Sequence, residues 1–546
     1  MVERAAPGRR LMEDEDRARQ ALRGVLLGFA FLTVLFSGVF PPFANPNELS
    51  RFQTVVASVD RGTFAIDPVL ALGNHEDKAV SGGRTYSNKA PGLALAALPV
   101  YRLLRGMLPP PSRGTSESIF WILRLLTVSL VCLLALARLG HRLAFRGRPG
   151  AALIVAGVAF GTPYVFYARS FFAHAWTAAL LFLSWDLLKI AEERHASRRI
   201  VLLLLGAGFL AGWAAISEYP VALVALTLGL RALAGRALRS FGLFGVGLAI
   251  PLGLLAVYDT ICFGAPWVLS SAREAYPEYS RLAATGLFGF GPPSFSVAAG
   301  YLLHPARGIL LFSPFLLWAV PGFLGWWRSG EDRADCTFAL TTTLLFFAVM
   351  TGYPNWQGGW SLGNRYLLPI VFFPALAIGR ALAAPLSRGL FAAAVLFSAA
   401  NHWLLTSSWP YFPENLPFPA AAGSSWFLRR GWIAPGLLNG SIGGGIAALA
   451  VSLLAFALPL ALAVRAAGPL SPRPALCALI GLAPLVALLL RPPDLDYPGQ
   501  LWRAAIYGAY SGRDAGREEL RRVALSALTP DQQRQAMGAW RAYGPR

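Results

Sequence analysis

The chain has 546 residues, of which 55% are hydrophobic and only 14% are charged. This composition excludes an ordinary soluble globular domain and indicates a polytopic membrane protein. The formal net charge of +20 comes mainly from short arginine clusters between apolar runs, a pattern typical of membrane-protein loops rather than of nucleic-acid binding.

The four cysteines, Cys132, Cys262, Cys336 and Cys477, are far apart and show no CxxC spacing. This pattern favours buried small apolar side chains over a disulfide framework or a metal site. The N-terminal segment, 1–21, is charged and runs into an apolar stretch without a small-residue cleavage site. We therefore expect a retained signal anchor with a cytoplasmic N-terminus.

Apolar runs that can cross a bilayer of about 30 Å follow one another along most of the chain. We expect thirteen spans, near 22–40, 118–140, 150–168, 171–190, 200–217, 219–234, 240–262, 306–327, 335–352, 365–384, 389–406, 441–465 and 474–490. A fourteenth run, 90–108, is short, opens with Pro91 and carries Arg102 and Arg105.

The basic clusters decide whether 90–108 crosses. If it does not, the clusters at 138–148, 189–199, 231–239, 328–333, 380–388 and 465–473 lie on the same side as Arg9 and Arg10. This is the positive-inside arrangement, so we expect 90–108 to be an interfacial or re-entrant helix.

The resulting fold class is an all-α polytopic membrane protein with about 13 transmembrane helices over 22–490. A long first extracytoplasmic loop, 41–117, would contain interfacial helices, and a short extracytoplasmic tail would occupy 491–546. Within this tail, Thr529, Pro530 and Gln532 predict the capped start of one small helix. The arginine-rich composition favours the inner (plasma) membrane of a bacterium.

The first outer loop holds an unusual number of charges for a segment that follows a membrane span. They are Glu48, Arg51, Asp60, Arg61, Asp67, Glu76, Asp77, Lys78, Arg84 and Lys89. Glu48 lies just beyond Pro41, Pro42 and Pro46, which end any preceding helix. A carboxylate at the mouth of a bundle suits a general base or a metal ligand, although an ordinary solvated loop glutamate has the same position.

Three short motifs in this loop resemble the first-loop pattern of GT-C membrane glycosyltransferases, such as lipid A aminoarabinose transferases and protein O-mannosyltransferases. They are Asn47-Glu48 with Arg51, Asp60-Arg61-Gly62, and Lys89-Ala90-Pro91-Gly92. The resemblance implies a GT-C-like bundle. It also implies inverting transfer of a sugar from a polyprenyl-phosphate carrier to a lipid, glycan or protein acceptor on the outer face. By family position Glu48 would be the catalytic residue beside the acceptor, and Lys89 would face the donor phosphate.

Two residues depart from the family pattern. Asn47 stands where an Asp is common, and Asn88 stands where many members have an acid before the Lys. Because amides bind divalent cations less well than carboxylates, metal dependence is doubtful. A divalent metal stays a possible cofactor, with Glu48, Asp77 and His174 as its candidate ligands, and no other cofactor is expected.

Several further outer-face residues are candidates for substrate binding. Arg169, His174 and Glu218 lie at junctions between apolar runs, where a local structural role is the alternative. In the turn YPNWQGGWSLGNRY, Trp356 and Trp360 suit sugar rings and Arg365 suits a phosphate, although tryptophans also form ordinary aromatic belts. The full set of predicted binding residues is Arg51, Asp77, Lys89, Arg169, His174, Glu218, Trp356, Trp360 and Arg365.

The alternatives to a glycosyltransferase are a polyprenyl-linked polysaccharide ligase or polymerase and a lipid-linked sugar transporter. A transporter needs polar residues near mid-membrane and broken helices, often in repeated halves. The expected spans are almost free of such residues, and the polar residues gather on one face. This favours surface chemistry over translocation.

Overall fold

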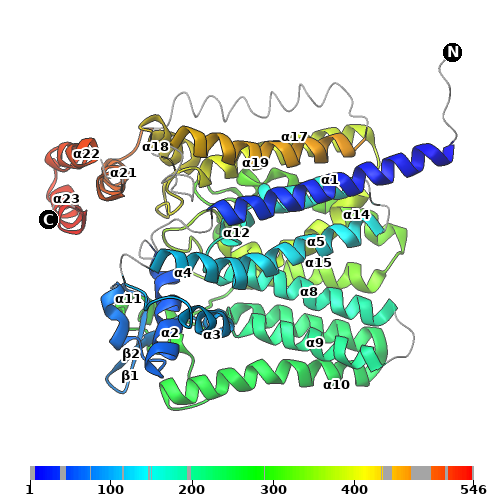
Figure 1. Cartoon of the computed structure of the whole chain (residues 1–546), viewed down its shortest axis with the longest axis horizontal. Coiled ribbons are helices and arrows are strands. Elements are labelled where there is room, and N and C mark those ends of the chain that lie inside the picture. Colours follow the sequence, from blue (N-terminus) through cyan, green and yellow to red (C-terminus); the bar gives the residue numbers. More distant parts are fainter. Residues whose placement is uncertain are drawn as a thin grey trace.

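The computed structural model describes residues 7–36, 45–73, 75–112, 116–145, 148, 150–193, 198–287, 289–431, 433, 445–468, 494–510 and 514–543. The chain is an all-α membrane protein whose long helices run side by side (Figure 1). Among the described residues, six helical segments are long and apolar enough to cross a membrane: 16–36, 118–144, 238–263, 333–350, 385–406 and 447–466.

The helices and strands occur in the following order. They are α1 Pro7–Phe36, α2 Pro46–Arg61, η2 Asp67–Leu72, β1 Lys78–Ser81, β2 Arg84–Ser87, α3 Gly92–Arg105, α4 Ser116–Leu123, η3 Arg124–Ser129, α5 Leu130–Phe145, α6 Ala151–Phe160, α7 Tyr164–Tyr167, α8 Ala173–Glu193, α9 Arg198–Ala215, η4 Tyr219–Val221 and α10 Ala222–Phe263. They continue with η5 Ser270–Arg273, α11 Pro277–Ala283, α12 Phe295–Leu303, α13 Ile309–Phe312, η6 Pro314–Trp318, α14 Ala319–Ser329, α15 Arg333–Met350, η7 Arg365–Ile370, α16 Phe372–Ile378, η8 Gly379–Ala381, α17 Pro385–Thr406, η9 Ala420–Ser425, α18 Trp426–Arg429, α19 Gly445–Ala466, α21 Tyr497–Tyr510, α22 Asp514–Leu525 and α23 Pro530–Tyr543.

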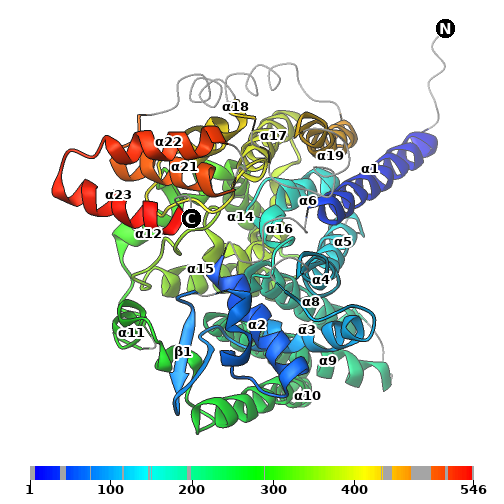
Figure 2. The ribbon, with the colours of Figure 1, turned by 60° about the vertical axis from the view of Figure 1, so that its left-hand side comes forward.

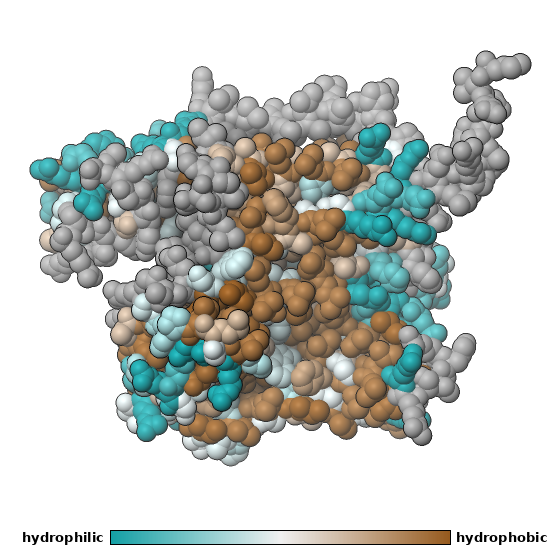
Figure 3. Space-filling view, viewed as in Figure 1, coloured by the Kyte–Doolittle hydropathy of each residue, from teal (hydrophilic) through white to brown (hydrophobic). Residues whose placement is uncertain are grey.

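The connections divide between the two ends of the bundle. One end, here called the loop end, carries α2, α3, the β1–β2 hairpin, α11, α18 and α21–α23 (left in Figure 1). The rotated view of Figure 2 brings this end forward and shows α2, α3, β1 and α11 together. The other end, here called the basic end, carries Arg142, Arg148, Arg231 and Arg380 with their acidic partners. Apolar side chains cover the helices between the two ends, and hydrophilic side chains lie at both ends (Figure 3).

The run 90–108 forms α3, which has 14 residues and contains Pro99. Asp60 at the end of α2 ties the two helices together, because it accepts hydrogen bonds from the Tyr101 hydroxyl (2.8 Å) and from Arg105 Nε (2.7 Å). The start of α3 is held against the end of α9, where the Gly92 N–H donates to the Ile216 carbonyl (2.8 Å). Both α2 and α3 therefore stay at the loop end, and α3 does not run the length of the bundle (Figure 1).

The two spans expected near 219–234 and 240–262 belong to one 42-residue helix, α10, which folds back on itself. A straight helix would place residues 229 and 244 about 22 Å apart, at 1.5 Å per residue. A Cβ added to Gly229 would instead lie 3.5 Å from the Phe244 ring and 3.6 Å from the Phe241 ring. The two arms, 222–234 and 238–263, are therefore antiparallel neighbours, as two separate spans would be.

Three expected spans are interrupted. The run near 150–168 is split into α6 and the short α7, that near 306–327 into α13, η6 and α14, and that near 365–384 into η7, α16 and η8. Pro163 and Pro314 stand at two of these breaks, and Pro369 lies within η7; none of them can donate a helical hydrogen bond. The expected span 474–490 and Cys477 lie outside the described residues. The other three cysteines are buried and free.

Glycines bring α9 and the second arm of α10 into backbone contact. A Cβ on Gly247 would lie 2.0 Å from the Leu205 carbonyl oxygen, and one on Gly208 would lie 1.9 Å from that of Phe244. Such small residues let membrane helices approach closely.

We expect Gly247→Ala to lower the free energy of unfolding by about 1–3 kcal/mol, the usual cost of overpacking. The contact is with backbone, so it cannot be relieved by a rotamer change. Gly245→Ala on the same arm is the matched control, because a Cβ there meets nothing within 4 Å. Unfolding of both proteins in mixed micelles would be followed by tryptophan fluorescence. Equal midpoints for the two variants would contradict the close packing.

The loop end contains two features that the sequence reading did not include. Strands β1 and β2 pair as an antiparallel hairpin around Gly82 and Gly83, both with positive φ (56° and 74°), the Gly-Gly pair that a tight two-residue turn favours. The tail forms three helices, α21–α23, rather than one. The predicted cap of α23 is confirmed, because Thr529 Oγ1 accepts from the Gln532 N–H (3.2 Å) and Gln532 Oε1 accepts from the Thr529 N–H (3.1 Å).

Candidate functional site

The first turn of α2 holds two of the predicted site residues at the loop end. The Asn45 side chain caps this helix by accepting a hydrogen bond from the Asn47 N–H (2.9 Å), and Pro46 takes the first helical position. Glu48 and Arg51 are both almost fully buried, with 1% and 2% of their surface exposed. Buried charges must find partners, and the two residues find different ones.

Glu48 is enclosed by donors on both carboxylate oxygens. Arg124 donates from Nε to Oε1 (3.1 Å) and from Nη2 to Oε2 (2.6 Å), which makes a two-pronged ion pair. The Phe171 N–H also donates to Oε1, and the Tyr411 hydroxyl donates to Oε2 (3.0 Å). The carboxylate therefore joins four separate parts of the chain, and its assignment as a general base stays a prediction.

Arg124 and Tyr411 were not among the predicted residues. Arg124 begins a π-helical segment, η3, inside the long apolar stretch 118–144, and its guanidinium lies over the Phe120 ring at 4.1 Å. A charge within an apolar span and a π-helical turn are both frequent at functional sites. The sequence does carry the first of these two signals.

One turn after Glu48, Arg51 turns toward the start of α10. Its Nη2 donates to Glu218 Oε1 (3.0 Å), and its Nη1 donates to the Asn47 side-chain oxygen. His174, at the start of α8, places Nδ1 3.6 Å from the same Glu218 oxygen. Burial raises the pKa of Glu218, and the charges of Arg51, Arg365 and Lys89 offset this only in part.

Lys89 and Asp77 form a third ion pair in the region, with Nζ 2.9 Å from Oδ1. Serines hold the backbone around them: Ser50 Oγ donates to the Asp77 carbonyl (2.8 Å), and Ser87 Oγ accepts from the Lys89 N–H (3.1 Å). Burial alone would raise the pKa of Asp77, but the charge and hydrogen bond of Lys89, together with the charges of His75 and Arg365, outweigh burial and lower this pKa. Asp77 is thus held as a carboxylate.

Arg365 opens η7 and lies among aromatic rings. Its guanidinium carbon is 5.2 Å from the ring centres of both Phe172 and Tyr366. Within the part of the chain that the structure describes, no carboxylate oxygen lies within ion-pair distance of Arg365, unlike Arg51 and Lys89. A cation on aromatic faces without a carboxylate partner is suited to an external anion.

Six of the predicted residues therefore meet at the loop end, and they are here called the loop-end polar cluster: Arg51, Asp77, Lys89, His174, Glu218 and Arg365. They come from α2, the segment before β1, the segment before α3, α8, the α9–α10 junction and η7. The cluster is not sealed, because the side chains of Glu218 and Lys89 keep 20% and 21% of their surface exposed.

The 263–305 segment adds Glu274 to the edge of this cluster. Glu274 pairs with Ala79 in an isolated β-bridge, and its Oε2 accepts from the Asn88 side chain (2.8 Å). Burial raises its pKa to about 7, with Lys89 and Asn88 opposing the shift. Glu274 was not among the predicted site residues, because several charged residues share this segment and the sequence does not distinguish it from them.

Three predicted binding residues lie apart from the cluster. Arg169 is buried and donates from Nε to the Val165 carbonyl (2.6 Å), and burial lowers its pKa to about 9. Trp356 packs edge-on against Tyr301 and His304, with ring centres 5.6 and 5.4 Å apart. Trp360 is 45% exposed. Their roles in binding stay predictions.

The backbone on both sides of Trp360 is fixed by one buried arginine. Arg307 donates from Nη2 to the Gly359 and Phe412 carbonyls (2.9 Å each) and from Nη1 to the Ser361 carbonyl. The Trp-rich turn and the 407–418 segment are thereby joined. Arg307 thus has a structural role, in that it connects these two segments.

The predicted metal ligands do not form a metal site. Glu48 is bound by Arg124 and Asp77 by Lys89, while His174 faces Glu218. Across the described ranges, no three His, Cys, Asp or Glu side chains are grouped as an ion would require. The described residues therefore do not fit a divalent cation.

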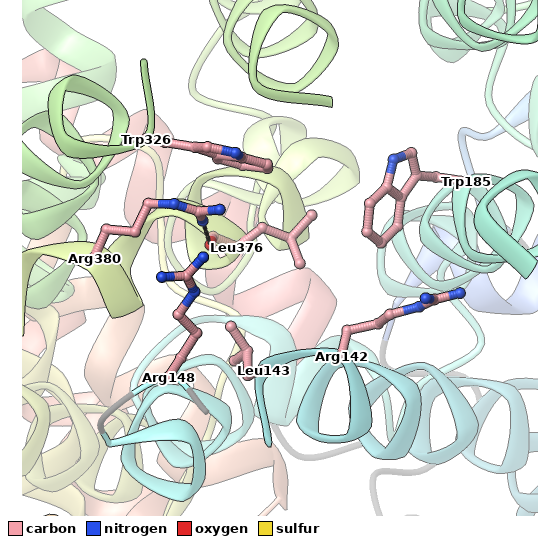
Figure 4. A pocket seen from close by; sticks show the side chains of 7 residues that line it. All are labelled: Arg142, Leu143, Arg148, Trp185, Trp326, Leu376 and Arg380. Atoms are coloured by element: carbon pink, nitrogen blue, oxygen red, sulfur yellow. Dashed lines mark hydrogen bonds between the residues drawn. The ribbon is translucent and has the colours of Figure 1, made fainter. Parts of the chain in front are cut away.

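The basic end also has hollows lined by charges. One is lined by Arg142, Leu143, Arg148, Trp185, Trp326, Leu376 and Arg380 (Figure 4). Its cavity of about 10 Å³ has room for about one water molecule. Arg142 bonds Asp186, and Arg148 and Arg380 both face Glu331. This hollow is too small for a sugar phosphate.

A second hollow at the basic end, of about 320 Å³, is lined by Lys189, Glu192, Arg231, Ala234, Asp332, Ala334 and Asp335. Lys189 and Arg231 lie 2.7 and 2.9 Å from the oxygens of the fully buried Asp335. Its charges form a network among themselves that ties α8, α10 and α15 together. The loop end is therefore the better candidate for a substrate site.

No protein-family model and no curated protein matches the chain. Among solved structures it is similar to ArnT from Cupriavidus metallidurans in the apo state, with 16% identity, a TM-score of 0.47, and coverage of 81% of this chain and 76% of that one. For the same protein bound to undecaprenyl phosphate the identity is 14% and the TM-score 0.45, with 90% of this chain and 82% of that chain covered. For the oligosaccharyltransferase of Archaeoglobus fulgidus in the apo form the identity is 12% and the TM-score 0.42, with 94% of this chain and 60% of that chain covered.

These proteins are of the kind that the first-loop motifs resemble. All three TM-scores are below 0.5.

Proposed function

We propose that the chain is an inverting glycosyltransferase that moves a sugar from a polyprenyl-phosphate carrier to a hydroxyl-bearing acceptor. The reaction would take place at the loop end, on the outer face of a bacterial plasma membrane. The acceptor would be a lipid, glycan or protein. The proposal combines the first-loop resemblance with the composition of the loop-end polar cluster.

The observation that carries the proposal is the convergence of Arg51, Lys89 and Arg365 at one end of an apolar bundle. A polyprenyl-phosphate donor has its chain in the bilayer and its phosphate at the interface, where such cations would meet it. Arg365 supports this assignment most directly, because no carboxylate of the described chain forms an ion pair with it.

The chemistry needs the two kinds of group that the cluster contains. As the acceptor oxygen bonds to the anomeric carbon, the bond from that carbon to the phosphate oxygen breaks, and its electron pair stays on the phosphate. Cations aimed at this growing charge stabilise the transition state more than the ground state. A carboxylate would take the proton of the acceptor hydroxyl. Attack from the face opposite the phosphate inverts the configuration of the anomeric carbon.

The test is release of prenyl phosphate by the purified full chain in lipid nanodiscs. A panel of polyprenyl-monophosphate sugars would be supplied with crude envelope lipids and glycans as acceptors. Each sugar would also be presented on a prenyl pyrophosphate as the matched comparison. We expect turnover of at least one monophosphate donor.

Two results would overturn the proposal. Turnover confined to the pyrophosphate donors would indicate a ligase or polymerase. Absence of turnover, together with movement of a labelled donor between the leaflets of vesicles that contain the protein, would indicate a transporter.

A further inference from the structure

Four glutamate or aspartate side chains lie near the cations: Glu48, Asp77, Glu218 and Glu274. Glu274 lies at the edge of the cluster, where its Oε2 accepts from Asn88 and the charge of Lys89 acts on it, whereas three cations act on Glu218. The other carboxylates differ in what their oxygens already bind. Both oxygens of Glu48 accept hydrogen bonds, two from Arg124 and one each from Phe171 and Tyr411. Asp77 is 2.9 Å from Lys89 and has 9% of its side chain exposed. Glu48 could not bind an acceptor hydroxyl without giving up a partner. Asp77 is the more buried of the remaining two, and its contact with Lys89 lowers its pKa, which makes it a weaker base than Glu218.

Glu218 has a different environment. Its Oε1 accepts from Arg51 (3.0 Å), while no hydrogen bond from the described residues reaches Oε2. The residue precedes η4 in extended conformation (φ −149°, ψ 108°), at the junction of α9 and α10. Its side chain is 20% exposed, compared with 1% for Glu48. One oxygen is therefore held in place by Arg51, and the other is available to a substrate.

We propose that Glu218 is the general base that accepts the proton of the acceptor hydroxyl through Oε2. This inference rests on the proposed glycosyl transfer. The proton moves from the acceptor oxygen to Oε2 as that oxygen bonds to the anomeric carbon. The departing prenyl phosphate keeps the electron pair of the broken bond, so charge is balanced without a metal or a covalent enzyme intermediate.

The groups around Glu218 are consistent with this role. Arg51 from α2, His174 from α8, Lys89 from the segment before α3 and Arg365 from η7 face it, and Tyr219 follows it in the chain. Burial raises the pKa of Glu218 despite the three cations, which makes this carboxylate a better proton acceptor than a solvated one. Arg51 and Glu48 then act as positioning residues.

The experiment compares Glu218→Gln with Glu48→Gln in the same nanodisc assay, using the donor that wild type turns over. The glutamine amide oxygen at position 218 can still accept from Arg51, so folding should be preserved. We expect Glu218→Gln to reduce kcat by about 100-fold or more, the usual scale for a general base. The Kd for a fluorescently labelled form of that donor should change by less than about threefold, because Arg51, Lys89 and Arg365 are still present to bind its phosphate.

The pH profile separates a base from a positioning residue. A base works when deprotonated, so wild-type kcat/KM should rise with pH through the raised pKa of Glu218 and then level off. This rising limb should disappear from the residual activity of Glu218→Gln and persist in Glu48→Gln. Glu218→Asp should keep the limb at a reduced rate.

The outcomes are distinguishable. Wild-type turnover with unchanged kcat in Glu218→Gln would overturn the assignment of Glu218 alone. Loss of the limb in Glu48→Gln would return the role of base to Glu48. If wild type turns over no monophosphate donor, the proposed function fails first, and the role of Glu218 fails with it.

Discussion

Replacing Arg124 with methionine is expected to lower the free energy of unfolding by about 3–5 kcal/mol, the range measured when one partner of a buried ion pair is removed. Arg124 and Glu48 are exposed by only 2% and 1%, and the guanidinium meets the carboxylate in a two-pronged contact. The variant would leave the Glu48 charge buried with only the Phe171 N–H and the Tyr411 hydroxyl as donors. Titration with denaturing detergent would measure the loss.

The double variant Arg124→Met with Glu48→Gln provides the internal control. Its neutral amide can still accept from Phe171 and Tyr411, so we expect it to be more stable than Arg124→Met alone. Arg199→Met, at an exposed position, should change stability by no more than about 0.5 kcal/mol. If the loss in free energy of unfolding of the double variant equals the sum of the losses for Arg124→Met and Glu48→Gln, the two charges are not coupled.

Replacing Arg365 with glutamine is expected to reduce the rate of sugar transfer by about 100-fold to 1000-fold, the effect of removing one group that stabilises transition-state charge. Arg365 would contact the donor phosphate in the proposed function, and no carboxylate of the described chain forms an ion pair with it. Initial rates at saturating donor would be measured in nanodiscs, with the Tm of each variant as a check on folding.

Arg365→Lys should recover part of this rate, because lysine keeps the charge but loses the planar fork and its stacking on Phe172 and Tyr366. Arg102→Gln is the matched control, since Arg102 is exposed on α3 outside the cluster. A normal rate in Arg365→Gln would remove this residue from the donor site.

Much of the architecture follows from hydropathy and charge. The long apolar stretches predict the helices, and the basic clusters predict that 90–108 stays with the loop end, where α3 lies. The fold-back of α10 follows from the same pattern, since arginines interrupt its apolar sequence at 231–239. The interruptions near 306–327 and 365–384 were missed because hydropathy averages over prolines such as Pro314 and Pro369.

The grouping of the polar residues was only partly accessible from sequence. The first-loop motifs and the junction positions led to Arg51, Lys89, Glu218 and Arg365, which do lie together. The partner of Glu48 was missed because Arg124 is 76 residues away and its role depends on how two helices pack. Which glutamate keeps a free oxygen is decided by such contacts, so the sequence alone favoured Glu48 through resemblance.

Arg307 binds three backbone carbonyls and so fixes the backbone on both sides of Trp360 without using the Trp360 side chain. The carbonyls of Gly359, Ser361 and Phe412 hold their positions whatever side chains those segments carry. Lysine has one nitrogen and could not span acceptors from two separate segments, so this position tolerates little drift. Trp360, by contrast, projects from a backbone that is already anchored. If Trp360 contacts the sugar or acceptor as predicted, a substitution there should alter the preferred substrate while the anchored backbone keeps its position.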